Sequence, residues 1–201
     1  MTASIFTPGV GLLLVALLTG CGQVERLLDP GPSLDLPDVR AGIGVDNADR
    51  SVAYSFDDVP LCLDAPGSVD IDSVELSNPT GGLVLRRFSV RDSPESGAMS
   101  YLQDQRTTLA AAGYPDGPFT VEQVCFDNRE EPSDERLSLL GFEVERAADS
   151  PDLPAYSTGL VVHYTSEGDE RSAFVGFAVL LCPGVISLRP DCDVHEVRPP
   201  D

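Results

Sequence analysis

The sequence contains no lysine, and all 13 basic residues among its 201 are arginine. A Walker-type phosphate loop, a Schiff-base enzyme and a Ser-x-x-Lys acyl-enzyme each depend on a lysine side chain. The absence of lysine therefore excludes all three classes of protein. Tryptophan is also absent and aromatic residues make up only 6% of the chain, so the core of a folded domain must rely on leucine and valine.

The sequence motifs of common hydrolases are absent as well. There is no Gly-x-Ser-x-Gly nucleophile elbow and no His-Glu-x-x-His zinc motif. The chain has two histidines, His163 and His195, and we expect His163 to point to solvent from the middle of a strand. A dispersed Ser-His-Asp site would have to use one of these two as its base. Because the sequence contains no recognisable set of catalytic residues, we predict that the protein is not an enzyme and holds no cofactor.

Positive charge is scarce in this chain. The 13 arginines face 33 carboxylates, which gives a net charge of −20 and an isoelectric point near 4.1. Such a surface repels nucleic-acid phosphates and anionic lipid headgroups. The composition therefore excludes nucleic acid as a partner, and attachment to a membrane would need an anchor other than a basic patch.

An apolar run, Val10–Leu18, leads directly into Thr19, Gly20 and Cys21. The run lies within the ~7–15 residues of a secretory signal and is shorter than the ~20 needed to span a bilayer. We therefore predict that residues 1–20 are a signal peptide. The segment Leu18-Thr19-Gly20-Cys21 resembles the lipobox of bacterial lipoproteins. The resemblance implies that the thiol of Cys21 carries a diacylglycerol and that the protein is lipid-anchored at the extracytoplasmic face of the cell membrane.

The segment before the apolar run departs from this pattern in one respect. Residues 1–7 contain no lysine or arginine, whereas positive charge at this place normally helps to set the orientation of a signal peptide. Either the α-amino group supplies that charge, or translation starts upstream of Met1. Both explanations leave the lipobox intact.

Four cysteines remain besides Cys21, and an even number in an exported domain predicts two disulfides. Cys182 and Cys192 flank a Pro-Gly turn and can close a local loop easily, so we favour a pairing that joins them. The alternative pairing joins Cys125 to Cys182. Long spacings and few histidines argue against a zinc site. The favoured pairs are Cys62–Cys125 and Cys182–Cys192, and the alternative is Cys125–Cys182.

Residues 21–50 are predicted to be the lipidated cysteine followed by a flexible tether. Prolines and glycines in this segment disfavour regular structure, and a coil of this length would span roughly 30 Å. The alternative is that Ile43 and Val45 already belong to a first strand. We place the folded domain at residues 51–196 and a frayed tail at residues 197–201.

Alternating apolar and polar residues predict seven or eight short strands, among them residues 69–76, 137–146 and 160–165, and hence an all-β fold. The spacing around Ile71 and Val74 indicates a bulge. The apolar segment Ser172–Cys182 predicts one central strand covered on both faces. One short helix is expected at about residues 98–112, ending before Gly113. The predicted architecture is an antiparallel β-sandwich, Ig-like, with this helix inserted.

Two turns are predicted from their residues. The segment Asn78-Pro79-Thr80-Gly81-Gly82 is a strong turn signal. Residues 164–171 are expected to form a hairpin connection around Ser166-Glu167-Gly168-Asp169.

Three further features resemble lipoproteins of high-GC Gram-positive bacteria. They are the Leu61-Cys62 opening, the expected helix ending near Ala112-Gly113-Tyr114, and the closing apolar strand ending at Cys182. The resemblance implies an envelope lipoprotein and brings no activity with it.

Carboxylates offer only weak metal-site candidates. Asp193 and His195 are two residues apart, so on a strand they would share a face and could bind a divalent cation. The acidic run at residues 127–135 lacks the spacing of an EF-hand loop, which indicates a solvated loop. Asp70 and Asp72 are expected on the polar outer face of a strand.

The functional expectation therefore rests on the anchor and the fold. We expect a lipid-anchored, extracytoplasmic β-sandwich that acts as a non-enzymatic interaction or accessory module of the cell envelope, with an envelope protein as partner. The alternative is a lipoprotein that binds a small ligand or a divalent metal and serves a transporter or a sensor.

Overall fold

A computed structural model of the chain describes residues 31–36, 41–93, 106–125, 137–150 and 153–192. These residues form ten strands and two short 3-10 helices, so the predicted all-β class is confirmed. In chain order the elements are β1 (Ala41–Val45), β2 (Tyr54–Leu61), β3 (Val69–Ser77), β4 (Leu83–Ser93), β5 (Phe119–Val121), β6 (Leu137–Arg146), β7 (Ala155–Ser157), β8 (Gly159–Ser166), β9 (Asp169–Val175), β10 (Phe177–Leu181), η1 (Ile186–Leu188) and η2 (Pro190–Cys192).

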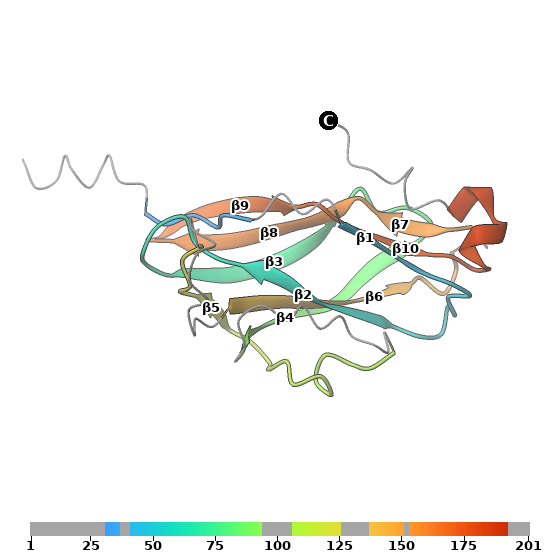
Figure 1. Cartoon of the computed structure of the whole chain (residues 1–201), viewed down its shortest axis with the longest axis horizontal. Helices are drawn as coiled ribbons and strands as arrows, with labels where there is room; N and C mark the ends of the chain where they lie inside the picture. Colours follow the sequence, from blue (N-terminus) through green and yellow to red (C-terminus); the bar gives the residue numbers. More distant parts are fainter. Residues whose placement is uncertain (1–30, 37–40, 94–105, 126–136, 151–152, 193–201) are drawn as a thin grey trace, which may run out of the picture. The chain divides into compact units, whose positions relative to one another are not determined.

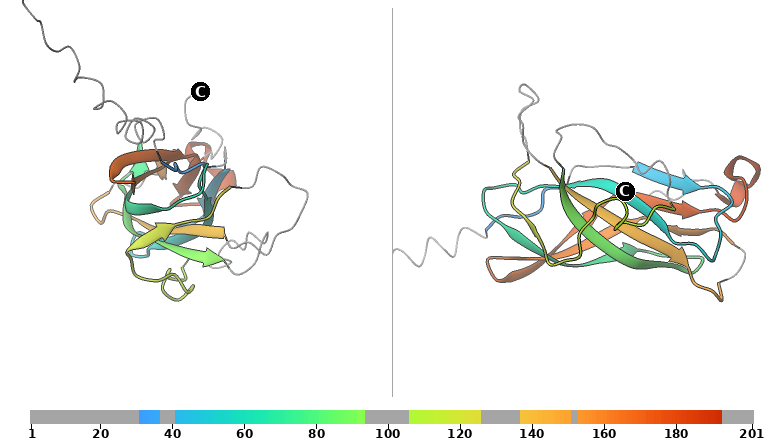
Figure 2. Two further views of the ribbon diagram at one scale, coloured as in Figure 1. Left: turned by 90° about the vertical axis from the view of Figure 1, so that its left-hand side faces the viewer. Right: turned by 90° about the horizontal axis from the view of Figure 1, so that it is seen from below.

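The strands form three sheets in a sandwich-like arrangement. One layer is the sheet β2-β6-β4, and the sheets β5-β3-β8-β9 and β1-β10-β7 lie across from it (Figure 1). Figure 2 shows β6 in the middle of its layer, between β2 and β4. All pairings are antiparallel except that of β1 with β10, which is parallel. The immunoglobulin-like subdivision of the fold stays a prediction.

Three phenylalanines connect the layers at the centre of the core. Phe56 on β2 and Phe142 on β6 lie 5.4 Å apart between ring centroids, and the ring of Phe177 on β10 lies 6.5 Å and 5.8 Å from them. All three are buried. Aliphatic side chains from all three sheets complete one continuous core around them, as the scarcity of aromatic residues predicted.

Several local predictions are confirmed by the backbone. The register of β3 against β8 shifts between Ile71 and Ser73, which is the predicted bulge. Asn78, Gly81 and Gly82 adopt positive φ angles in the β3–β4 turn. The β8–β9 hairpin turns through Glu167 and Gly168, whose φ angles of 51° and 92° match the positive values that a two-residue type I′ turn requires at both central positions.

The apolar segment that predicted a single strand, residues 172–182, is instead divided between two sheets. Its first part belongs to β9, an edge strand of one sheet, and its second part is β10, the fully buried centre of another. The change occurs at Gly176, which lies in neither strand. Glycine is a usual residue at such a bend because it has no side chain to accommodate. The predicted burial on both faces therefore holds for β10 and is wrong for β9.

The folded domain begins earlier than residue 51, so the predicted tether is too long. Ala41–Val45 forms β1 and pairs along its whole length with β10, and Leu34 is buried and bridges Leu63. The alternative that placed Ile43 and Val45 in a first strand is therefore correct. The prolines and glycines misled the prediction because β1 gains its pairing from a strand more than 130 residues away. Residues 22–30 and the tail at 197–201 lie outside the described residues.

The predicted helix at residues 98–112 is not formed in its described part. Residues 106–113 make a series of turns, and a single backbone bond from Ala112 N–H to the carbonyl of Thr108 has helical spacing. We call residues 106–118 the strap. It lies over the outer face of the β2-β6-β4 sheet, as the yellow-green loop below β4 in Figure 1. Residues 98–105 are outside the described part.

The strap is held by tertiary contacts that replace regular helix bonds. Leu109 and Tyr114 are buried, and Glu143 accepts a hydrogen bond from the Leu109 N–H at 2.8 Å. The guanidinium of Arg91 lies 4.4 Å from the centre of the Tyr114 ring and donates to the carbonyl of Ala112. Burial of Leu109 and Tyr114 against the sheet explains why the helix propensity of the alanines did not decide the local structure.

The favoured disulfide pairing is confirmed. Cys62 pairs with Cys125, closing a separation of 63 residues, and Cys182 pairs with Cys192 over 10 residues. In the chain-entropy model the long loop contributes about 4 kcal/mol and the short loop about 3 kcal/mol. The first bridge is half-buried near the carbonyl of Asp35, whereas both cysteines of the second bridge are fully buried.

We predict that Gly141→Ala destabilises the domain by about 1–3 kcal/mol through overpacking. A Cβ atom at this position of β6 would lie 2.8 Å from Leu109 Cδ2 and 2.8 Å from Tyr114 Cε1. Urea unfolding would measure the loss. The control is the same change in a Leu109→Ala background, where one of the two close contacts is gone and the added cost must shrink. Equal costs in both backgrounds would contradict the tight packing of the strap.

We predict that mild reduction of the folded protein opens Cys62–Cys125 before Cys182–Cys192, because only the first bridge is accessible to a reductant. Alkylation at increasing phosphine concentration, followed by peptide mass spectrometry, gives the order. The unreduced protein unfolded in urea serves as control and should show no free thiol at these four positions. Four reactive thiols in that control, or earlier labelling of Cys182, would refute the assignment.

Candidate functional site

Polar side chains cover much of the outer face of the β5-β3-β8-β9 sheet. Side chains of β3 alternate between core and solvent until the bulge, where two consecutive residues, Asp72 and Ser73, lie between the buried Ile71 and Val74. A bulge re-aims side chains in this way because one strand gains an unpaired residue. Here it brings extra polar groups to the outer face.

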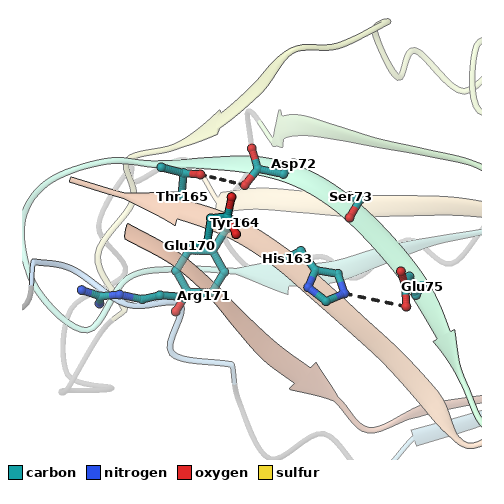
Figure 3. Close-up of a pocket in the computed structure, with 8 residues that line it drawn as sticks. All are labelled: Asp72, Ser73, Glu75, His163, Tyr164, Thr165, Glu170 and Arg171. Atoms are coloured by element: carbon teal, nitrogen blue, oxygen red, sulfur yellow. Dashed lines mark hydrogen bonds and ion pairs between the residues drawn. The ribbon is translucent and has the colours of Figure 1, made fainter. Parts of the chain in front are cut away.

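A hollow of about 350 Å³ lies on this sheet. Figure 3 shows the side chains that surround it, which come from the three adjacent strands β3, β8 and β9. The register places His163 of β8 between Ser73 of β3 and Ser172 of β9. The residues lining the hollow are Asp72, Ser73, Glu75, His163, Tyr164, Thr165, Glu170 and Arg171.

His163 occupies the middle of β8, as the sequence predicted. Its Nε2 atom lies 3.8 Å from Glu75 Oε2, which is beyond hydrogen-bond distance (Figure 3). The side chain is 39% exposed, yet Nε2 itself is buried and makes no hydrogen bond with any described residue. The imidazole therefore lies partly over the sheet, and its outward-facing edge is open to solvent.

Two threonine hydroxyls bind the carboxylates that the sequence placed on an outer strand face. Thr165 donates to Asp72 Oδ2 at 2.8 Å, and Thr120 donates to Asp70 Oδ1 at 2.7 Å. Both aspartates are exposed, so the predicted polar exterior is confirmed. These short bonds run across neighbouring strands and hold each carboxylate in one orientation above the sheet.

The outer face is acidic because Arg171, the one arginine in the four strands of this sheet, points to the other side. Arg171 of β9 donates to Ser33 Oγ at 2.9 Å and to the carbonyls of Gly31 and Pro32, on the inner side of the sheet. Among the described side chains of these four strands, the outer face therefore presents carboxylates without an arginine. The carboxylates are Asp70, Asp72, Glu75 and Glu170.

The hollow brings together the residue types of a Ser-His-acid hydrolase without their geometry. Ser73 is the cross-strand partner of His163, and Glu75 lies two residues further along β3 with its Oε2 atom 3.8 Å from the imidazole Nε2. A working site needs a hydrogen bond between nucleophile and imidazole and a second one that orients the ring. Among the described residues neither bond is present. The arrangement suits binding of a cation or of hydrogen-bond donors better than acyl transfer.

The metal-site candidates of the sequence stay predictions. No group of three or more His, Cys, Asp or Glu side chains in the described part of the chain has the arrangement of a metal site. Asp193, His195 and the acidic run at 127–135 lie outside the described residues. Just before them, Arg189 donates to both carboxylate oxygens of Asp191 at 3.0 and 2.6 Å, which holds the pKa of Asp191 below its usual value.

Sequence reasoning singled out His163, Asp70 and Asp72 but missed Glu75, Thr165 and Glu170 as their neighbours. The hairpin signal at residues 166–169 already contained part of this information. A two-residue turn pairs Thr165 with Glu170 and His163 with Ser172. The contact with β3 could not be found in this way, because it joins strands about 90 residues apart.

The lipidation candidate Cys21 also lies outside the described residues. Within the part that is described, no helix has both the length and the apolar character needed to cross a bilayer. Comparison with models of known protein families found no match to this chain. Comparison with curated proteins likewise found no protein that matches it.

Proposed function

We propose that this protein is a lipid-anchored β-sandwich at the extracytoplasmic face of the cell membrane, where it acts as a non-enzymatic interaction module of the envelope. The observation that carries the proposal is Cys21, which ends a lipobox-like segment directly after a signal-length apolar run. Acyl chains on this residue would supply the membrane affinity that a protein of charge −20 cannot gain from anionic headgroups.

The two disulfides support an extracytoplasmic location. Disulfides persist in oxidising compartments and are rare in the cytosol. Both bridges join segments that the fold needs: Cys62–Cys125 connects the end of β2 to the segment after β5, and Cys182–Cys192 closes the end of β10 over the 3-10 helices. A domain stabilised in this way suits the outside of the cell.

The acidic outer face of the β5-β3-β8-β9 sheet is the surface that we assign to interaction. Its carboxylates lie on strands of one sheet, and the hydroxyls of Thr120 and Thr165 donate hydrogen bonds to two of them. A pre-positioned face of one charge accelerates encounter with a partner of opposite charge and discriminates against acidic ones. The partner expected for this face is therefore a basic surface of another envelope protein.

Binding of a small ligand or a divalent metal is the second candidate. The hollow around His163 is the observation that favours it, because an imidazole and three carboxylates line it. In this reading the lipoprotein would serve a transporter or a sensor. The absence of a three-ligand group among the described residues favours the interaction module over the metal version of this candidate.

We predict that Cys21→Ala releases the protein from membranes or blocks its maturation, because the thiol that we propose to carry the lipid is lost. Fractionation of cells expressing the full chain, with immunoblotting of membrane and soluble fractions, measures this. Gln23→Ala, which leaves the lipobox-like segment intact, is the matched control and should remain in the membrane fraction. If Cys21→Ala fractionates with the membrane like the control, the anchor proposal fails.

We predict that Ca²⁺, Zn²⁺ and Cu²⁺ leave the melting temperature of the purified protein unchanged. A bound cation at a free concentration of 100 times its Kd would raise the free energy of unfolding by about 2.7 kcal/mol, which a thermal scan detects easily. A rise in melting temperature would favour the second candidate instead. In that case His163→Gln distinguishes the sites, since it abolishes a rise that comes from the hollow and preserves one that comes from elsewhere.

A further inference from the structure

The seven-residue strand β9 is an edge of the β5-β3-β8-β9 sheet (Figure 1). Its hairpin with β8 turns through two residues, so Ser166 and Asp169 form a hydrogen-bonded pair and every second residue after Asp169 also bonds to β8. The backbone N–H and C=O groups of Glu170, Ser172 and Phe174 must then point away from β8. In the described part of the chain no other backbone group bonds to them.

The other sheet edges carry features that discourage pairing with a further strand. β5 and β7 are three residues long, β1 has only five, and the two edges of the remaining sheet, β2 and β4, each contain a register shift. β2 also contains Pro60, which cannot donate a hydrogen bond. Short strands, bulges and prolines are the usual protections of an edge. β9 has none of the three. It has seven residues, contains no proline, and keeps a regular register with β8 throughout.

The side chains next to the free edge of β9 define what can pair with it. Phe174 is 47% exposed, and its ring lies over Gly159, where an added Cβ would be 2.7 Å from the ring. Glu170, four residues earlier on β9, lies on the same outer face and lines the hollow together with Asp72. An incoming strand would therefore place alternate side chains against an acidic end and an apolar end.

A second copy of this chain is a poor occupant of that edge. Two copies paired through β9 would bring two acidic sheet faces side by side and join two bodies of charge −20. Like charges opposite one another destabilise a strand pair. The charge favours a strand that carries arginine or lysine where the edge presents Glu170, and an apolar side chain where it presents Phe174.

We propose that β9 is a docking edge, to which an extended segment of a basic envelope partner adds as a further strand. Main-chain hydrogen bonds to Glu170, Ser172 and Phe174 would give the affinity, and the alternating side chains would give the specificity. This inference rests on the proposed interaction function and names the element that performs it. Its test uses purified protein and therefore succeeds or fails independently of the fractionation of Cys21→Ala.

The probe is the peptide acetyl-Thr-Arg-Thr-Arg-Thr-Val-Thr-amide, which places two arginines and one valine on the same face of a strand. Amide hydrogen exchange of the mature, detergent-solubilised protein, followed by NMR, should show fast exchange at Glu170, Ser172 and Phe174. Saturating peptide should slow exchange at these three amides by about tenfold or more, consistent with the formation of backbone hydrogen bonds. Protection of the three amides before peptide is added would mean that the edge is already covered and would overturn the proposal.

Two peptide controls separate strand addition from attraction of charge. A peptide with the same sequence but N-methyl groups on alternate residues keeps both arginines and loses the donors that face β9. A third peptide has glutamate in place of arginine. Both should bind at least about tenfold more weakly than the probe. Equal binding of the N-methylated peptide would reduce the interaction to non-specific electrostatics and refute the docking edge.

Ser172→Pro tests the edge from the protein side. It removes one outward N–H while the hydrogen bonds between β8 and β9 stay in place, since residue 172 does not bond to β8. The variant should bind the probe about tenfold more weakly, and Ser172→Thr, which keeps the N–H, should bind it as the unsubstituted protein does. Unchanged amide protection in β10 shows that the variant is folded. Wild-type affinity in a folded Ser172→Pro variant, or concentration-dependent dimerisation through these amides, would exclude a partner strand.

Discussion

The structure depends on one segment that serves two sheets. Residues 169–181 run as the edge strand β9, bend at Gly176 and continue as β10, the fully buried centre of the β1-β10-β7 sheet. Phe177, the first residue after the bend, packs against Phe56 and Phe142 of the opposite layer. The end of β10 is then closed by the buried Cys182–Cys192 bridge. The core, the parallel pairing with β1 and the second disulfide all depend on this one change of sheet.

Much of the fold could be predicted from the sequence because its signals are local. Alternating residues located β3, β6 and β8, a five-residue Asn-Pro-Thr-Gly-Gly turn located the β3–β4 connection, and the extra residue near Ile71 located the bulge. The Cys182–Cys192 pair followed from its short local loop, and it left Cys62 and Cys125 as the other pair. These features concern chain neighbours or elements that a short turn connects, so their physical cause lies within a few residues of each other.

The errors arise where distant parts of the chain decide. β1 is a strand only because β10 offers it a buried edge, and the Ala-rich turn of the strap is not helical because Leu109 and Tyr114 are buried against Gly141. The apolar pattern from Ala173 to Leu181 does not reveal the bend, since apolar residues recur at every second position on both sides of Gly176. The hollow shows the same limit: its hairpin half was predictable, while its β3 half depends on pairing at a separation of about 90 residues.

Charge and strand geometry on the outer face lead to the same kind of partner. A regular, seven-residue edge strand is an aggregation hazard for an isolated domain unless something opposes self-pairing. Here the opposing factor is electrostatic. Glu170 lies on that edge strand, and Asp72 and Glu75 lie two strands away on the same outer face. The four strands of this sheet present no arginine on that face, because Arg171 is engaged by Ser33 on the inner side. This repulsion acts only between copies of like charge, whereas a bulge or a proline would exclude every strand. An edge protected by charge alone therefore remains open to a basic strand, which connects the acidity of the surface to the selection of a partner.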